Sequence, residues 1–208
     1  MGRSENSRNR IFSRTEDGIR TEAFDPAKLS DPSLIIYAPV RRLENRLIVS
    51  NGDQTDTIYD GLQRGLSLSE ALSAREFEPD APNYTPRISG MLHFADGGFS
   101  YELSILKSDR MNPDQCLRFY FHYATPLPGE GHFIHTYIGD GNPLQSFCGE
   151  PKCIAVSDEL DAFAAKIWDA LDPENKISLY VRETDLTDGT GKNYREVLIN
   201  RNEKNQEA

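Results

Sequence analysis

The segment from Asn51 to Ile58 has the pattern of a strand-to-helix turn with small polar side chains. It reads Asn51-Gly52-Asp53-Gln54-Thr55-Asp56-Thr57-Ile58 and follows an apolar run that ends at Ser50. The first amides of a helix have no acceptor within the helix, so such a turn can bind an anion or a polar heterocycle. The same residues also suit a helix start that Asp53 or Thr55 caps. The pattern leaves a ligand-binding turn and a simple cap as alternatives.

A second segment places an arginine at the start of a predicted strand. It reads Asn83-Tyr84-Thr85-Pro86-Arg87-Ile88. Pro86 stiffens the approach, and Arg87 can present its planar guanidinium to a carbonyl, a carboxylate or a phosphate. An ion pair with one of the many acids of this chain is the alternative.

A third segment, Pro128 to Tyr137, contains Glu130, His132 and His135, which invite interpretation as metal ligands. The residues Phe-Ile-His-Thr-Tyr favour a strand, in which positions three apart point to opposite faces. A shared metal is therefore not expected. Either histidine alone could carry a proton because imidazole titrates near neutrality, although a structural histidine is the commoner outcome.

The N-terminal run contains three arginines, Arg3, Arg8 and Arg10, among hydroxyl and amide side chains. Such a run could clamp a phosphate group. A solvated basic tail is the alternative, because chain termini often fray.

These segments need strands and helices to position them, and strand patterns are in the majority. The apolar and β-branched runs predict strands at Arg10 to Ser13, Ile19 to Phe24, Leu34 to Ala38, Arg46 to Ser50, Ile88 to Ala95, Phe99 to Lys107, Cys116 to Tyr123, His132 to Tyr137, Cys153 to Val156, Ile177 to Arg182 and Tyr194 to Arg201. The Asp96-Gly97 step predicts a hairpin with a primed turn.

Three helices are predicted. Thr55 to Arg64 forms the first, and the capping box Ser67-Leu68-Ser69-Glu70 opens the second, Leu68 to Ala74. The third runs from Asp158 to Leu171, with Ser157 as its cap and an apolar stripe that faces the core. Strands with a few amphipathic helices predict an α+β fold with helices on antiparallel sheets.

Composition limits the function classes. The net charge is −10 over 208 residues, which argues against a protein that works by neutralising nucleic-acid phosphates. Residues 1–50 hold nine Lys/Arg against seven Asp/Glu, so the positive excess lies near the N-terminus. No run is long and apolar enough for a membrane span or a secretion signal, and we expect a cytoplasmic protein. The three cysteines are expected to be reduced.

Several of these segments resemble, in order and separation, the stand-alone inosine-monophosphate cyclohydrolases of archaea and some bacteria. The resemblance rests on Asn51 to Ile58, on Asn83 to Ile88 and on the Arg-Ser run that ends at Asn9-Arg10. The bacterial branch is also similar at Glu78-Pro79-Asp80-Ala81-Pro82 and at Gly129 to His135. The resemblance is close over residues 1–156 and loose beyond.

The resemblance implies an αββα sandwich like that of the N-terminal-nucleophile hydrolases, without a processed nucleophile. It implies closure of 5-formamido-imidazole-4-carboxamide ribonucleotide (FAICAR) to inosine monophosphate (IMP), the last step of de novo purine synthesis, with no cofactor and no metal. Family members carry a further N-terminal strand before the Arg-Ser run. We therefore expect one domain over residues 1–201, short of that strand, and a frayed tail at 202–208.

Side-chain chemistry then suggests roles for the singled-out residues. The expected catalytic residues are Arg87, Glu130, His135, Asp56 and Tyr84, with Arg87 facing the reacting oxygen, Glu130 and His135 as proton carriers and Tyr137 as a further assistant. The expected substrate-binding residues are Arg3, Arg8, Arg10, Asn51, Gly52 and Thr55. A non-catalytic purine-nucleotide-binding module and a metal-dependent hydrolase remain as alternatives. The expected partner is FAICAR or IMP, without nucleic acid or membrane, and a homo-oligomer is left open.

Overall fold

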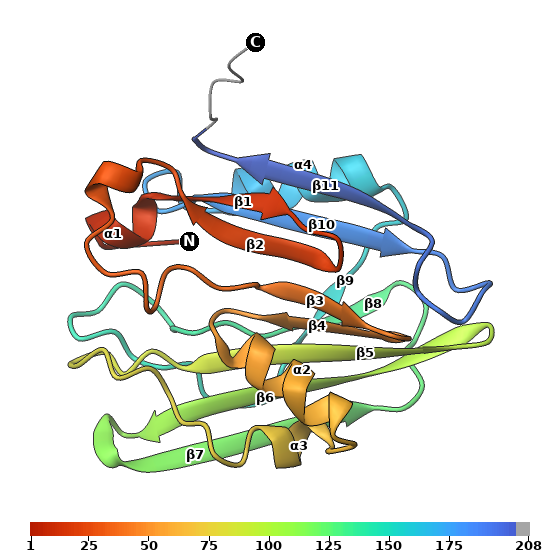
Figure 1. Ribbon diagram of the computed structural model, residues 1–208, viewed down its shortest axis with the longest axis horizontal. Helices are drawn as coiled ribbons and strands as arrows, with labels where there is room; N and C mark the ends of the chain where they lie inside the picture. The colour runs from red at the N-terminus through yellow and green to blue at the C-terminus, as the bar shows by residue number, and fades with distance from the viewer. Residues whose placement is uncertain (203–208) are drawn as a thin grey trace.

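The computed structural model describes residues 1–202 and contains eleven strands and four α-helices over that range (Figure 1). In chain order the elements are α1 (Glu5–Arg8), β1 (Arg10–Arg14), β2 (Gly18–Ala23), the 3-10 turn η1 (Pro26–Lys28), β3 (Val40–Leu43), β4 (Arg46–Ser50), α2 (Gln54–Gln63), α3 (Leu68–Ala71), β5 (Arg87–Ala95), β6 (Gly98–Asp109), β7 (Asn112–Tyr123), β8 (Glu130–Phe133), β9 (Lys152–Ala155), α4 (Leu160–Ala170), β10 (Ser178–Thr184) and β11 (Tyr194–Asn200). Of the predicted tail, residues 203–208 lie outside the described residues.

Strands β1 to β7 form one antiparallel sheet in which the spatial order follows the chain order. The pairs β1–β2, β3–β4, β5–β6 and β6–β7 are joined by short turns, whereas residues 24–39 join β2 to β3 and residues 51–86, with α2 and α3, join β4 to β5. The predicted hairpin at Asp96-Gly97 is confirmed as β5–β6, but only Gly97 of the two central residues has a positive φ, so the turn is not of a primed type. The primed geometry occurs instead at Arg110-Met111 between β6 and β7, where both φ angles are positive.

Helices α2 and α3 cover one face of this sheet. Ile48, Met91 and Leu106 point toward them from β4, β5 and β6, because alternate residues of a strand share a face. The helices contribute the other half of this core, which is Ile58, Leu62, Leu68 and Leu72. All seven side chains are less than a tenth exposed, and their burial fixes α2 above the start of β5.

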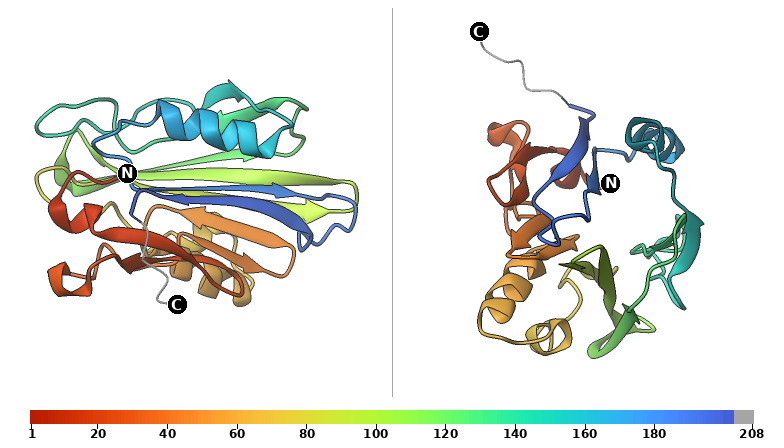
Figure 2. Two further views of the ribbon diagram at one scale, coloured as in Figure 1. Left: turned by 90° about the horizontal axis from the view of Figure 1, so that it is seen from above. Right: turned by 90° about the vertical axis from the view of Figure 1, so that its right-hand side faces the viewer.

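The opposite face carries the C-terminal elements. The β10–β11 hairpin packs through Tyr180 and Leu198 on a second core that includes Ile19, Leu47 and Phe94. Helix α4 packs on β10 and β11, and β8–β9 forms a separate hairpin. Figure 2 shows α2 and α3 on one side of the strands and α4 on the other. The molecule is therefore a mixed α/β protein whose sheets are all antiparallel.

Two of the predicted strands are wrong in whole or in part. Residues Leu34 to Ala38 form turns, in which the amides of Ile35 and Ile36 donate to Pro32 O, and the third strand of the sheet is instead β3. The apolar run is bounded by Pro32 and Pro39, and prolines suit turns better than paired strands. The predicted strand from His132 to Tyr137 stops at Phe133.

The predicted helices are confirmed, the first shifted by one residue and the other two with shorter bounds. The capping box of α3 is present, with Ser67 accepting from the Glu70 amide and Glu70 from the Ser67 amide. Helix α4 begins at Leu160 after Glu159, so the prediction of Ser157 as its cap is wrong. The Ser157 hydroxyl accepts from the Glu159 amide, but Ser157 lies two residues before the N-cap position. The single-domain interpretation stays a prediction.

Candidate active site

The buried guanidinium of Arg87 is the centre of the candidate site. Arg87 is the first residue of β5 and is 6% exposed. Its Nη1 donates to Asp53 Oδ1 at 2.6 Å and to Gln54 Oε1 at 2.9 Å, both on the turn that begins α2. These two bonds use both Nη1 hydrogens. Nε and Nη2 have no acceptor among residues 1–202, so three N–H groups remain for a ligand.

Amide side chains hold the turn and the start of β5 together. Asn51 donates to Pro86 O at 2.9 Å and accepts from the Ile88 amide at 2.9 Å. Gln54, which is fully buried, donates to Asn51 Oδ1 and to Ile88 O. Asn51 therefore works as a local brace between two segments that are 35 residues apart in the chain.

Gly52 and Thr55 give this turn its shape. A Cβ on Gly52 would lie 2.8 Å from Arg87 Nη1 and 2.7 Å from Gln54 Oε1, so only glycine leaves room for the guanidinium. The Thr55 hydroxyl is buried against the Ser50 hydroxyl and Gly52 O. The predicted strand-to-helix turn is present here, and the polar side chains of the turn hold its backbone in place.

Glu78 is a buried carboxylate that the sequence-based assignment of roles missed. Its Oε1 lies 3.9 Å from Arg87 Nη1, and its side chain is 11% exposed. Burial raises the pKa of Glu78 to about 7, and the neighbouring Asp80 and Asp53 add to this, although Arg87 and Arg10 pull the pKa down. A carboxyl group that titrates near neutrality can both give and take a proton at working pH.

Arg10 and Tyr37 complete the far side of Glu78. Burial raises the pKa of the Tyr37 hydroxyl, while Arg10, which is in hydrogen-bonding contact with Tyr37, pulls the pKa down. Arg10 also acts on Glu78 through its charge. The structure thus places Arg10 near Glu78, together with Tyr37 from the loop that was mistaken for a strand.

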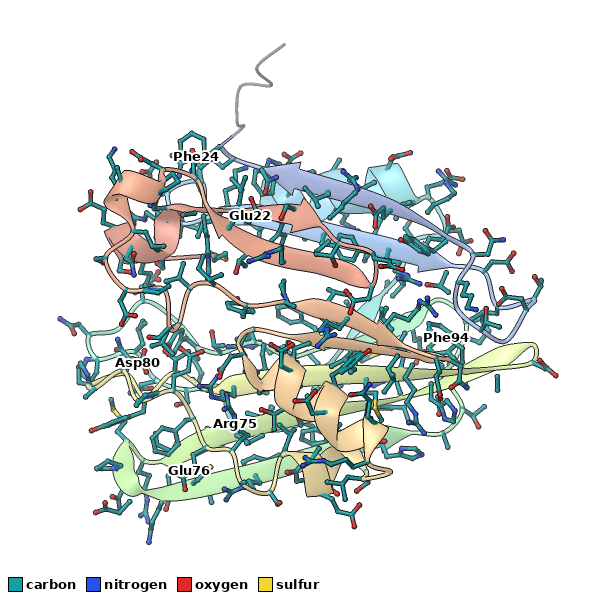
Figure 3. All side chains as sticks on the ribbon, in the orientation of Figure 1. Glu22, Phe24, Arg75, Glu76, Asp80 and Phe94 are labelled. Carbon is teal, nitrogen blue, oxygen red and sulfur yellow. The ribbon has the colours of Figure 1, made fainter. Side chains whose placement is uncertain are left out.

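Thr85 connects Glu78 to Asp80 and Tyr137. The Glu78 amide donates to Thr85 O at 2.9 Å, and the Thr85 amide donates to Asp80 Oδ1 at 2.6 Å. The Thr85 hydroxyl contacts both the Asp80 carboxylate and the Tyr137 hydroxyl. Burial raises the pKa of Tyr137 to about 12, so this tyrosine stays protonated. Figure 3 shows Asp80 and Arg75 toward one end of the sheet and Phe94 at the other.

Tyr84 lies between these groups in the chain and packs against the apolar side of the loop. Its ring meets Phe77 edge-to-face with the centroids 5.4 Å apart. Its φ of +46° is rare for a residue other than glycine. The structure therefore places Tyr84 next to the site through the backbone of the Asp80–Thr85 loop.

Three of the predicted catalytic residues are in contact with groups other than Arg87 and Glu78. Asp56 pairs with Arg41 at 2.9 Å on the outer side of α2. Glu130 is exposed on β8 and approaches Cys153. His135 donates from Nδ1 to Tyr137 O at 2.7 Å and packs between Phe133 and Phe147.

Two of the three N-terminal arginines also lie apart from Arg87. Arg3 pairs with the exposed Asp140. Arg8 donates to Asn175 Oδ1 at 2.9 Å and lines a pocket of about 230 Å³ with Lys176 and Arg201. The expected three-arginine clamp is therefore divided among three places.

The three residues considered as metal ligands have different neighbours. His132 contacts the Tyr101 hydroxyl, stacks on Tyr123 at 3.9 Å and lies opposite Cys153 across the β8–β9 hairpin, whereas His135 packs between Phe133 and Phe147. Within residues 1–202, no group of three or more His, Cys, Asp or Glu side chains is arranged to hold a metal ion. No helix in that range is long and apolar enough to cross a membrane.

Comparison with known proteins finds a family to which this sequence is similar. The family described as "IMP cyclohydrolase-like protein" matches residues 1–189. A curated relative named IMP cyclohydrolase, from Methanopyrus kandleri, is 32% identical over 117 residues, which is 54% of this chain and 52% of the relative. The match thus spans about half the length of that relative. Because the family match extends over most of the sequence, the chain belongs to the IMP cyclohydrolase-like family.

Proposed function

We propose that this protein is an IMP cyclohydrolase that closes FAICAR to IMP with loss of water. The proposal is supported by the family match and by the name of the relative from Methanopyrus kandleri. The observation that carries it is the buried Arg87 guanidinium, which keeps N–H donors free beside a carboxyl group whose pKa is about 7.

The reaction needs no nucleophile from the protein. The carboxamide nitrogen of the substrate attacks its formyl carbon, so a C–N bond forms and the formyl oxygen becomes an oxyanion. Nε and Nη2 of Arg87 are suited to hydrogen-bond that oxyanion, because a guanidinium stays cationic and planar. The oxygen takes up two protons in turn and leaves as water: the attacking carboxamide nitrogen loses one proton, and the formamido nitrogen loses the other as the C–O bond breaks and the C=N bond of the new ring forms. Glu78 is the group we assign to these transfers.

Proximity supplies much of the remaining rate enhancement. The protein has to hold the formamido and carboxamide groups in the attacking geometry, and a well-oriented intramolecular reaction gains up to about 7–11 kcal/mol. We keep Arg87, Arg10, Asn51, Gly52, Thr55 and Tyr84 in the proposed site and add Glu78, Tyr37 and Tyr137. Arg3, Arg8, Asp56 and Glu130 are not part of the proposal, because their partners lie elsewhere. His135 is left out because it contacts the Tyr137 backbone and the rings of Phe133 and Phe147, and neither Arg87 nor Glu78.

We also infer an αββα layering, with α2 and α3 on one outer side and α4 on the other. It is supported by the packing of α2 and α3 on one face of the seven-stranded sheet and by that of α4 on β10 and β11. The cytoplasmic location, the absence of a cofactor and any homo-oligomer stay predictions.

The test is a direct assay of ring closure by ultraviolet absorbance, with FAICAR as substrate and IMP binding measured by calorimetry. We expect turnover by the wild-type chain, and IMP binding without turnover would instead support a binding module. Arg87→Ala should lower the turnover rate at least about tenfold.

The control for this variant is the exposed Arg20, which has no part in the site, and Arg20→Ala should leave turnover unchanged. Because Arg87 is buried, Arg87→Lys serves as a second variant that keeps the charge and loses the planar fork. Wild-type turnover in a folded Arg87→Ala or Arg87→Lys protein would remove Arg87 from the mechanism.

A further inference from the structure

A second arginine, Arg75, pairs with the same carboxylate as Arg87. Arg75 Nη2 lies 2.6 Å from Asp53 Oδ2, while the other oxygen of the same carboxylate, Oδ1, accepts from Arg87 at 2.6 Å. Asp53 therefore bridges two guanidinium groups with one oxygen for each. The side chain of Arg87 is 7% exposed and that of Arg75 is 25% exposed, so Arg75 is the more solvent-exposed of the two arginines.

Asp53 pairs with the two arginines instead of capping helix α2. It is the N-cap residue of α2, where an aspartate normally accepts a hydrogen bond from an amide of the first turn. Here Asp53 has helical backbone angles, φ −67° and ψ −8°, and its side chain makes no cap hydrogen bond. The carboxylate is thus committed to the two arginines.

The backbone of Arg75 is held by two hydrogen bonds. Its backbone carbonyl accepts from Arg118 Nη2 at 2.8 Å, a contact that ties the loop to β7. Its amide donates to Leu72 O at 3.0 Å, directly after α3. The guanidinium is therefore delivered from a fixed point of the backbone.

We propose that Arg75 is a positioning residue for the proposed ring closure: by pairing with Asp53 it fixes the carboxylate that orients the Arg87 guanidinium. The inference rests on the proposed function of Arg87. Arg75 does not touch the reacting atoms in this account. It acts by restricting Asp53, so that Arg87 keeps Nε and Nη2 directed away from the turn.

The electrostatic balance gives Arg75 a second effect, on Glu78. Burial works against ionisation of Asp53, but the contact with Arg75 and the charge of Arg87 outweigh it and lower the pKa of Asp53. The charged groups that act on Glu78 are Arg87, Asp80, Asp53 and Arg10, and the neutral hydroxyls of Tyr37 and Tyr137 lie nearby. Without Arg75, the negative charge of Asp53 is less compensated and raises the pKa of Glu78 further.

The experiment compares Arg75→Gln, Arg75→Lys and the control Arg41→Gln. The side chain of Arg41 is 23% exposed and pairs with Asp56 of α2, the helix that begins after Asp53. It does not contact Arg87. For Arg75→Gln we expect kcat and kcat/KM to fall together, by about tenfold, because an orienting contact acts on the transition state. We also expect the midpoint of the pH–rate profile near pH 7 to move upward. Arg75→Lys should restore the midpoint and part of kcat, and Arg41→Gln should leave both unchanged.

A readout without substrate separates this inference from the proposed function. Carbon NMR titration of the carboxyl groups should show a higher pKa for both Asp53 and Glu78 in Arg75→Gln than in the wild type. If the wild type does not close the ring, the proposed function fails while this titration still tests the pairing. Unchanged carboxyl titrations in Arg75→Gln, or equal kinetic losses in Arg75→Gln and Arg41→Gln, would overturn the inference.

Discussion

At the scale of single residues, one guanidinium is shared unequally by two carboxylates. Asp53 is 2.6 Å from Arg87 Nη1 and has a lowered pKa, whereas Glu78 is 3.9 Å away, more deeply buried, and has a pKa raised to about 7. Environments that push two acids in opposite directions divide their roles. Asp53 keeps its charge and holds Arg87, and Glu78 is left to exchange protons.

The raised pKa of Glu78 makes folding stability depend on pH. Between the usual value of 4.5 and the folded value of about 7, the folded state binds more protons than the unfolded state, so stability falls as pH rises through this window. The full effect is on the order of 3 kcal/mol. Glu78→Gln should remove it. Denaturant unfolding at about pH 5 and about pH 8 measures the loss in each protein.

The matched control is Glu16→Gln, because Glu16 is exposed and lies apart from the site. This variant should follow the wild type at both pH values. A Glu78→Gln protein that loses the same stability as the wild type between the two pH values would show that Glu78 does not titrate in this window.

The residues that local sequence patterns singled out and those that they missed differ in a physical way. Arg87 and Asn51 follow from local patterns, a proline-arginine strand entry and a strand-to-helix turn. Glu78 does not, because its importance comes from burial between segments that are distant in the chain. Its only sequence signal was the segment Glu78-Pro79-Asp80-Ala81-Pro82, noted for its resemblance to the bacterial branch. Tyr37 was not considered as a site residue, because its apolar neighbours predicted a strand.

At the scale of elements, the turn before α2 can lie close to Arg87 because Gly52 has no side chain. Gly52 does not need a left-handed backbone, since its φ is not positive, but it needs space. The guanidinium of Arg87 and the amide of Gln54 occupy the positions that a β-carbon would require. The close approach of β5 to α2 therefore depends on this glycine.

Gly52→Ala should displace Arg87 and lower kcat/KM at least about tenfold, because small misplacements of a positioned group reduce the rate strongly. The control is Gly98→Ala, because nothing lies within 4 Å of a Cβ built on Gly98. Gly98→Ala should retain wild-type kinetics. Full activity in Gly52→Ala would mean that the turn yields without moving the guanidinium.

Element prediction succeeded where one periodicity dominated. The long strands β5, β6 and β7 and the helices α2 and α4 were expected from their alternating or helical apolar patterns. Strand β3 was missed because two arginines interrupt its four residues, Val40–Leu43. Arg41 is nevertheless accommodated in the sheet, because it pairs with Asp17 and Asp56 and lies over the Tyr59 ring. The side chains that favour this strand come from other parts of the chain.

At the scale of the whole molecule, one side chain takes the place of backbone pairing where the two ends of the described chain meet. Asn200 of β11 accepts from the Phe12 amide at 2.8 Å and donates to Phe12 O at 3.0 Å, as a neighbouring strand would do for β1. Its oxygen also accepts from the Ser178 hydroxyl at 2.7 Å. The C-terminal hairpin is thereby attached to the first strand of the large sheet.

Asn200→Ala should lower the free energy of unfolding by roughly 1–3 kcal/mol, because it leaves backbone groups of Phe12 without partners in a half-buried seam. Urea denaturation measures the loss. The exposed Asn193→Ala, which removes one hydrogen bond to Asp185, should cost less. Equal stabilities for the two variants would mean that β1 and β11 are held together by other contacts.

The neighbour-to-neighbour order of β1 to β7 has a consequence for biosynthesis on the ribosome. Each new strand pairs with the strand made before it, although residues 51–86 separate β4 from β5, so pairing can advance strand by strand during translation. The seam between Phe12 and Asn200 is the exception, because its partners are 188 residues apart. One edge of the nascent sheet therefore waits uncovered until β11 has emerged, and this interval is when a chaperone would have the most to protect.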